Sequence, residues 1–150
     1  AVGADGSVYY STRIESGNLL EQFTPEQQTA LLTTLGFVDT AGMTLPRYTV
    51  QIYRLDPAAQ TETLIFEGDA YAIGRMAELN ANTLIFSTIA NQGELFNAIA
   101  NGTLDPLTPE GYTAAQALVP VILYQVGLNG GSAPTMLGED LAQFSLVPLS

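Results

Sequence analysis

The clearest alternation of apolar and polar residues runs over residues 47–55. A period of two is that of a half-buried β-strand. Residues 56–60 have turn composition, and residues 61–67 read as a returning strand, so the pattern predicts a β-hairpin with a loop of about five residues. The side chains expected to face the core are Tyr48, Val50 and Ile52.

Shorter runs predict further strands. They lie at residues 7–14, 70–73, 83–89 and 143–147. Gly68 and Asp69 form a bulge or a turn before residues 70–73 continue the sheet. Residues 121–126 are β-branched and fit either a buried strand or a continuing helix, because their periodicity does not separate the two.

Capping residues predict two or three short helices. Thr24 and Thr108 each precede Pro and Glu, and this pairing of an N-cap with a first-position proline favours a helix start. Asn91 with Glu94 indicates another start. A short helical turn is expected at residues 18–22, and Gly36, Gly102 and Pro120 supply stops.

Strands and helices interleave along the chain, which is typical of an α+β domain with a mainly antiparallel sheet. The 150 residues fit one globular domain, residues 1–150, with residues 1–6 as a small, flexible N-terminal lead. Hydrophobic residues make up 47% of the chain, enough to build a core of ordinary size.

Charged residues make up only 13%, and the net charge is −11. The chain has no basic cluster, so we expect no nucleic-acid partner, because phosphate contacts need Lys or Arg. No apolar stretch reaches the roughly 20 residues of a membrane-spanning helix, so no membrane span is expected. A weakly charged surface suits a subunit whose partners are copies of itself.

Several reactive side chains are missing. The chain has no Cys and no His, and its four basic residues are all arginines (Arg13, Arg47, Arg54 and Arg75). Thiol nucleophiles, imidazole bases and the preferred ligands of transition metals are therefore excluded. We expect no cofactor, no catalytic residue and no enzyme activity.

Few constellations remain as candidate sites. Glu67 and Asp69 are weak calcium candidates, since residues two apart on a strand share a face. Asp5-Gly6-Ser7 lacks the further oxygen ligands of a calcium loop. Asn101-Gly102-Thr103 is a formal glycosylation triplet that also serves as a helix stop. The strand tyrosines either pack in the core or stack on a sugar, a pigment or a partner.

Three functions fit these observations. The first is a non-catalytic, extracytoplasmic structural subunit that self-assembles into a filament, coat or surface layer, with Val8, Tyr9 and Tyr10 joining neighbours through strand pairing. The second is a secreted carrier or recognition domain that binds an apolar or sugar ligand in a sheet-lined pocket. The third is a carboxylate-based hydrolase. Low charge, absent lysine and a small-residue start indicate an extracellular, cell-surface or virion protein after removal of a leader.

Overall fold

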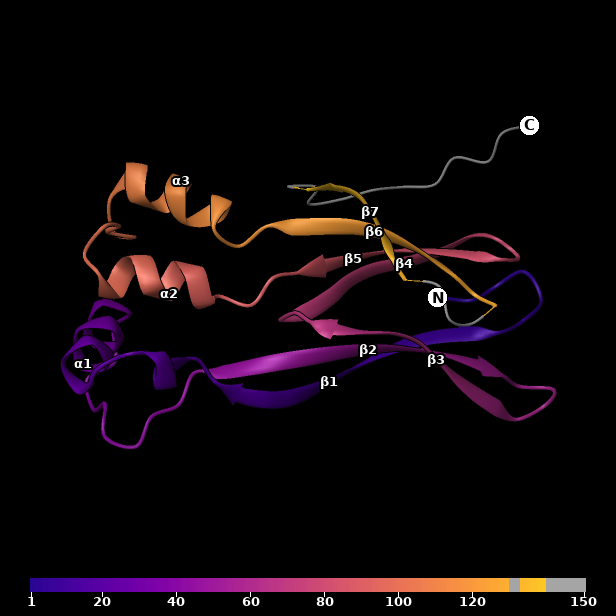
Figure 1. Ribbon diagram of the computed structural model, residues 1–150, viewed down its shortest axis with the longest axis horizontal. Helices are drawn as coiled ribbons and strands as arrows, with labels where there is room; N and C mark the ends of the chain where they lie inside the picture. The colour runs from indigo at the N-terminus through magenta and orange to yellow at the C-terminus, as the bar shows by residue number, and fades with distance from the viewer. Residues whose placement is uncertain (130–132, 140–150) are drawn as a thin grey trace. The chain divides into compact units, whose positions relative to one another are not determined.

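The computed structural model describes residues 1–129 and 133–139. Figure 1 traces its strands and helices along the chain. In chain order they are β1 (Val8–Asn18), the 3-10 turn η1 (Leu19–Gln22), α1 (Pro25–Thr34), β2 (Pro46–Asp56), β3 (Thr61–Asp69), β4 (Ala72–Asn80), β5 (Thr83–Ile89), α2 (Gly93–Ala100), α3 (Pro109–Ala117), β6 (Val121–Gly127) and β7 (Thr135–Glu139).

The strands form two sheets, with the orders β1-β2-β3 and β4-β5-β6-β7. Each pairing from β2 to β3 and from β4 through to β7 is antiparallel. Thr12 bonds Gln51 and Ser16 bonds Arg47, so β1 and β2 also run in opposite directions. The predicted α+β class with mainly antiparallel sheet is confirmed.

The predicted β-hairpin is present as β2 and β3, closed by residues 57–60. Asp56 stabilises this turn, since its Oδ1 accepts the amides of Ala58 and Ala59 at 3.0 and 3.2 Å. Val50 and Ile52 are at most 1% exposed, while Tyr48 is half-buried. Alternation along β2 therefore sets the inward face as the sequence indicates.

The expected bulge lies elsewhere. Gly68 and Asp69 remain in register within β3, opposite Val50 and Thr49, and the register shifts instead between Ile52 and Tyr53. Residues 70–73 do not continue the same sheet, because β4 starts at Ala72 and pairs with β5. A local apolar run marks a strand without specifying the sheet to which it belongs.

The second sheet contains one strand with the predicted bounds, β5. Residues 121–126, for which the sequence left strand and helix open, form strand β6, which pairs with β5 along its whole length. Most of β4 and all of β7 were not predicted. The register of β4 shifts between Ile73 and Met76, where the Ser87 hydroxyl accepts the Arg75 amide at 3.0 Å.

A hydrophobic core joins the two sheets. Tyr9 and Ile52 come from the first sheet, and Leu84, Phe86 and Val126 come from the second. Phe66 of β3 extends this packing, with its ring centroid 4.6 Å from that of Phe86. Side chains from both sheets thus meet on their inner faces, as in a β-sandwich.

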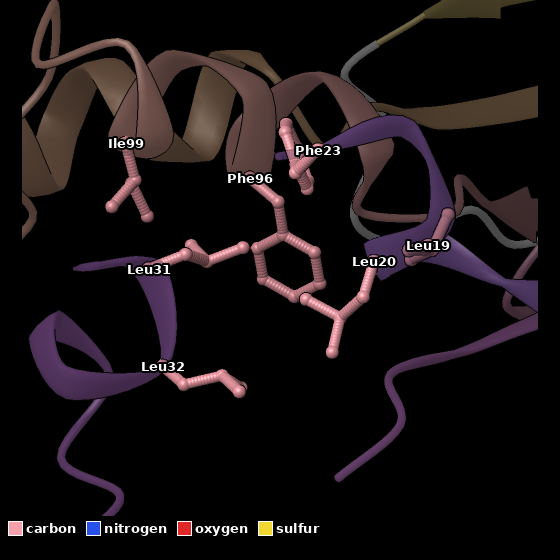
Figure 2. Packing of buried hydrophobic residues seen from close by; sticks show 7 residues of the cluster. All are labelled: Leu19, Leu20, Phe23, Leu31, Leu32, Phe96 and Ile99. Carbon is pink, nitrogen blue, oxygen red and sulfur yellow. The ribbon is translucent and has the colours of Figure 1, made fainter. Parts of the chain in front are cut away.

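A second core forms among the helices. Figure 2 shows the Phe96 ring of α2 lying among leucines that include Leu20 and Leu31. The helix α1 begins with the predicted capping box, in which Thr24 and Gln27 bond each other's backbone amides. The cap of α2 differs from expectation. It is Gln92, without a side-chain bond, in place of Asn91.

The chain divides into two compact units. One contains residues 1–14, 48–90 and the described residues from 120 onward, and the other contains residues 15–47 and 91–119. The unit boundaries fall within β1 and β2, so both strands contribute residues to each unit. The single domain over residues 1–150 stays a prediction. The predicted strand at residues 143–147 lies outside the described residues.

Candidate interaction site

The N-terminal residues fold back onto β1. Val2 forms an antiparallel bridge with Val8, and the Tyr9 amide donates to the Ala1 carbonyl at 2.8 Å. The Gly3 amide donates to the Ser7 carbonyl at 2.7 Å. Residues 1–5, called the arm below, thus pair with the start of β1. The predicted mobility of residues 1–6 stays a prediction, although these small residues form ordered backbone contacts.

A tight turn connects the arm to β1. Gly6 has a φ of +84°, in the left-handed region that favours glycine, and its amide donates to the Gly3 carbonyl at 3.0 Å. Asp5 Oδ1 accepts the Ser7 amide at 2.9 Å. The Asp-Gly-Ser triplet is therefore an Asx-type turn. This structural role accounts for the triplet without a bound calcium ion.

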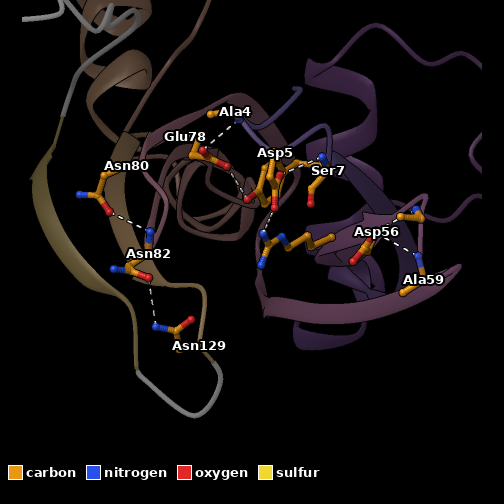
Figure 3. A network of polar contacts seen from close by, with 12 residues as sticks. Ala4, Asp5, Ser7, Asp56, Ala59, Glu78, Asn80, Asn82 and Asn129 are labelled. Atoms are coloured by element: carbon orange, nitrogen blue, oxygen red, sulfur yellow. Dashed lines mark hydrogen bonds and ion pairs between the residues drawn. The ribbon is translucent and has the colours of Figure 1, made fainter.

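Glu78 of β4 binds both the arm and β1. Its Oε1 accepts the Ala4 amide at 3.1 Å (Figure 3), and its Oε2 accepts the Tyr9 hydroxyl at 2.8 Å. Gly3 is buried beside this carboxylate, and a Cβ at that position would collide with the Glu78 side chain. Glycine at position 3 therefore allows the arm to approach β4.

Arg54 of β2 binds the arm from another strand. Its guanidinium forms an ion pair with Asp5 at 2.7 Å, and the two side chains are 26% and 57% exposed. An ion pair this exposed is screened by solvent and adds little to stability. Within the described residues, the buried Arg54 Nε has no hydrogen-bond partner. A surface cavity of about 270 Å³ lies here, lined by Ala4, Asp5, Arg54, Glu78 and Ala81.

The arm contacts alter two pKa values. The Ser7 amide and hydroxyl, followed by Arg54, lower the pKa of Asp5 by stabilising its carboxylate. Burial raises the pKa of Tyr9 to about 12, and the hydrogen bond to Glu78 contributes further. At neutral pH the Asp5 carboxylate is charged and the Tyr9 phenol is a neutral donor. Each group is thus in the form that its contacts require.

The predicted assembly residues have different environments. Val8 is 36% exposed, Tyr9 is 1% exposed within the core, and Tyr10 is half-buried. Of the three, only Val8 offers much side-chain surface to a neighbour. Their role in assembly stays a prediction.

The outer face of the first sheet carries an aromatic and polar cluster. The rings of Tyr10 and Tyr53 stack with centroids 5.5 Å apart. The hydroxyls of Tyr53 and Thr12 both donate to Gln51 Oε1, at 3.0 and 3.1 Å. The amide nitrogen of Gln51 donates in turn to Glu67. This cluster, called the tyrosine face below, spans three strands.

The weak calcium candidates lie along β3. Glu67 stands opposite Gln51 and Asp69 opposite Thr49. Within residues 1–129 and 133–139, no three acidic residues lie close enough together to hold a metal ion. The glycosylation candidate Asn101 is the C-cap of α2, and its side chain contacts Asn97 and Gln27. Calcium binding and glycosylation stay predictions.

Arg54 and Glu78 were not identified from the sequence. Arg54 lies 49 residues from Asp5, and Glu78 lies 69 residues from Tyr9, so no local spacing connects them. The available signal was the position of each charge in a strand that also carries core-facing apolar residues, since a charge that is partly buried needs a partner.

Comparison with known proteins found no match. No protein-family model matches the chain, and no curated protein or solved structure is significantly similar to it. Among the described residues, no helix has the length and apolar character needed to cross a membrane.

Proposed function

We propose that the protein is a non-catalytic structural subunit that assembles with copies of itself outside the cell or in a virion. This proposal is based on the large apolar side chains that are exposed on both units. Val38 is fully exposed and Leu107 is 80% exposed, while Val2 and Tyr112 are 71% and 61% exposed. Burying such side chains against neighbouring subunits is favourable, at about 25 cal/mol per Å².

The outer strands of the two sheets support the same proposal. Within the part of the chain that the structure describes, these strands are β1, β3, β4 and β7, and backbone groups along such edges can pair with another chain. The strand β7 contains exposed Met136 and Leu137, and Glu139 is its only charged residue. Edge strands usually carry charges that oppose association, so a weakly charged edge favours pairing.

The acidic side chains support a non-catalytic role. Glu78 accepts bonds from Ala4 and Tyr9, Asp5 pairs with Arg54, and Glu67 accepts from Gln51. These carboxylates hold strands and turns together. A general acid or base instead needs a proton-transfer partner in a substrate pose.

Electron microscopy of the purified protein over a range of concentrations tests this proposal. We expect particles or filaments built from a regular repeat, with more of them at higher concentration. Isolated particles of the 15.9 kDa chain at every concentration would contradict it. Hydrolysis of a carbohydrate or ester substrate that is lost in a Glu67→Gln variant would contradict the non-catalytic part.

The tyrosine face favours a second function, the binding of a neutral saccharide. Stacked Tyr10 and Tyr53 offer aromatic surface on the same face as the Glu67 carboxylate, and sugars present apolar C–H faces together with hydroxyl donors. A panel of neutral oligosaccharides tests this function by calorimetry. Tyr53→Ala should abolish binding, whereas Tyr112→Ala, in the other unit, should leave it unchanged. No binding to the unmodified chain would refute it.

A further inference from the structure

The contacts of the arm are made to groups that every copy of the chain presents. Val2 pairs with Val8, Ala4 donates to Glu78, and Asp5 pairs with Arg54. A second copy offers the same Val8, Glu78 and Arg54. An arm from one chain can therefore make each of these contacts on another chain with the same geometry.

In the closed state the arm pairs with β1 of its own chain, and in the exchanged state it pairs with β1 of another copy. The two states differ in the conformation of the turn that connects the arm to β1. Gly6 closes this turn with its φ of +84°, and the bond from its amide to Gly3 exists only while the chain reverses. In an exchanged arm the chain continues from Asp5 toward the neighbour, and Gly6 can return to the extended conformation that all residues adopt. Exchange of an identical element is a low-cost route to association.

The two apolar side chains of the bridge favour the exchanged state, because exchange brings them near a second subunit. Val2 and Val8 are 71% and 36% exposed while the arm is closed. When two copies exchange arms, both bridges come close to the other subunit, where these side chains can be covered. The closed form keeps the arm at a high effective concentration, of millimolar order, so exchange is expected at high subunit concentration.

We propose that the arm exchanges between copies, so that residues 1–5 of one subunit occupy the β1 edge of the next. This inference rests on the proposed self-assembly and identifies a surface at which it occurs. The partner is a second copy of the same chain, and Gly6 is the hinge.

A hinge substitution tests the exchange. A Cβ at Gly6 meets no atom within 4 Å, so Gly6→Ala strains only the positive φ of the closed turn. That strain disfavours the closed turn about fivefold per hinge, and the dimerisation constant of a reciprocal dimer should rise about 25-fold. Gly36→Ala is the matched control, because Gly36 also has positive φ, at +94°, and open space around it. It should leave dimerisation unchanged.

Disulfide trapping then locates the arm. The chain has no cysteine, so a Val2→Cys, Val8→Cys double variant contains a single possible pair. Bridged residues of antiparallel strands have Cα atoms about 4.5–5.5 Å apart, within the range of a disulfide. Oxidation of the assembled protein should link two chains through two disulfides, whereas oxidation of dilute monomer should close the disulfide within one chain. A Val2→Cys, Ala59→Cys variant, whose second cysteine lies on the exposed turn between β2 and β3, controls for random cross-linking.

The outcomes separate this inference from the proposed function. Assembled protein whose cysteines link only within one chain would overturn arm exchange and leave self-assembly standing. A monomer at all concentrations, with or without Gly6→Ala, would overturn both. Equal effects of Gly6→Ala and Gly36→Ala on dimerisation would also overturn the assignment of Gly6 as the hinge.

Discussion

The hydroxyl of Tyr9 donates a 2.8 Å hydrogen bond to Oε2 of Glu78, which joins β1 of the first sheet to β4 of the second. The other oxygen of the same carboxylate accepts the Ala4 amide. One acidic side chain therefore links the inner faces of the two sheets and holds the arm. Its position between core and surface explains why a charged residue lies in β4.

Tyr9 should make stability depend on alkaline pH. Its pKa is raised to about 12 in the folded state, whereas an unfolded tyrosine titrates near 10. The unfolded state loses this proton first, so the stabilisation is complete below pH 10 and is lost between about pH 10 and 12. A difference of about two pKa units corresponds to about 3 kcal/mol, which is the upper limit of this effect.

The ultraviolet absorbance of tyrosinate provides the measurement. Tyr9 should ionise in a late step near pH 12, and Tyr9→Phe should remove that step. Tyr112→Phe, at an exposed tyrosine, is the control and should leave the late step in place. Retention of the step in the Tyr9→Phe variant would show that another group causes it.

A charge in the core should destabilise the hairpin. Val50 is 1% exposed, so Val50→Asp buries an unpaired carboxylate and should lower the free energy of unfolding by several kcal/mol, about 3 or more. Leu64→Asp makes a similar change at a 48% exposed position on the paired strand, and should cost about 1 kcal/mol or less. Urea denaturation measures both variants. Equal losses would place Val50 on the wrong face of β2.

Two glycines in the helices should respond differently to alanine. A Cβ at Gly111 would collide with the backbone carbonyl of Asp105, so Gly111→Ala should cost about 2 kcal/mol or more. A Cβ at Gly93 would lie 3.6 Å from Leu19, an ordinary contact, and Gly93→Ala should be neutral or stabilising by up to about 1 kcal/mol. Thermal unfolding of the two variants provides the comparison. A stable Gly111→Ala protein would contradict the close packing before α3.

Charges on the exposed apolar side chains should weaken assembly without unfolding the chain. Val38→Asp and Leu107→Asp alter side chains that make little contact in the isolated chain, so stability should change by less than about 0.5 kcal/mol. Assembly should require a subunit concentration about tenfold higher if either side chain becomes buried between copies. Thr33→Asp, at an exposed polar position, is the control. Unchanged assembly in both variants would place the interface elsewhere.

Local chemistry made part of the fold predictable. Thr24 and Gln27 form their capping box within four residues, and the alternation around Val50 sets its own face. Such features depend on neighbours that the sequence displays together. Thr83–Ile89 was predictable as β5 for the same reason, since its apolar side chains are continuous.

Features that depend on distant residues were not predictable. The chain leaves the first sheet after Asp69 and enters the second at Ala72, and no residue in that short connection identifies the destination. The contact between Tyr9 and Glu78 spans 69 residues. The pairing of the arm with β1 was not predictable either, because its bridge consists of bonds between backbone groups, which every sequence contains.

Sedimentation equilibrium over a wide concentration range measures self-assembly of the chain in solution. We expect an average mass that rises with concentration from 15.9 kDa through multiples of that value. A mass that stays at 15.9 kDa up to the highest soluble concentration would contradict it.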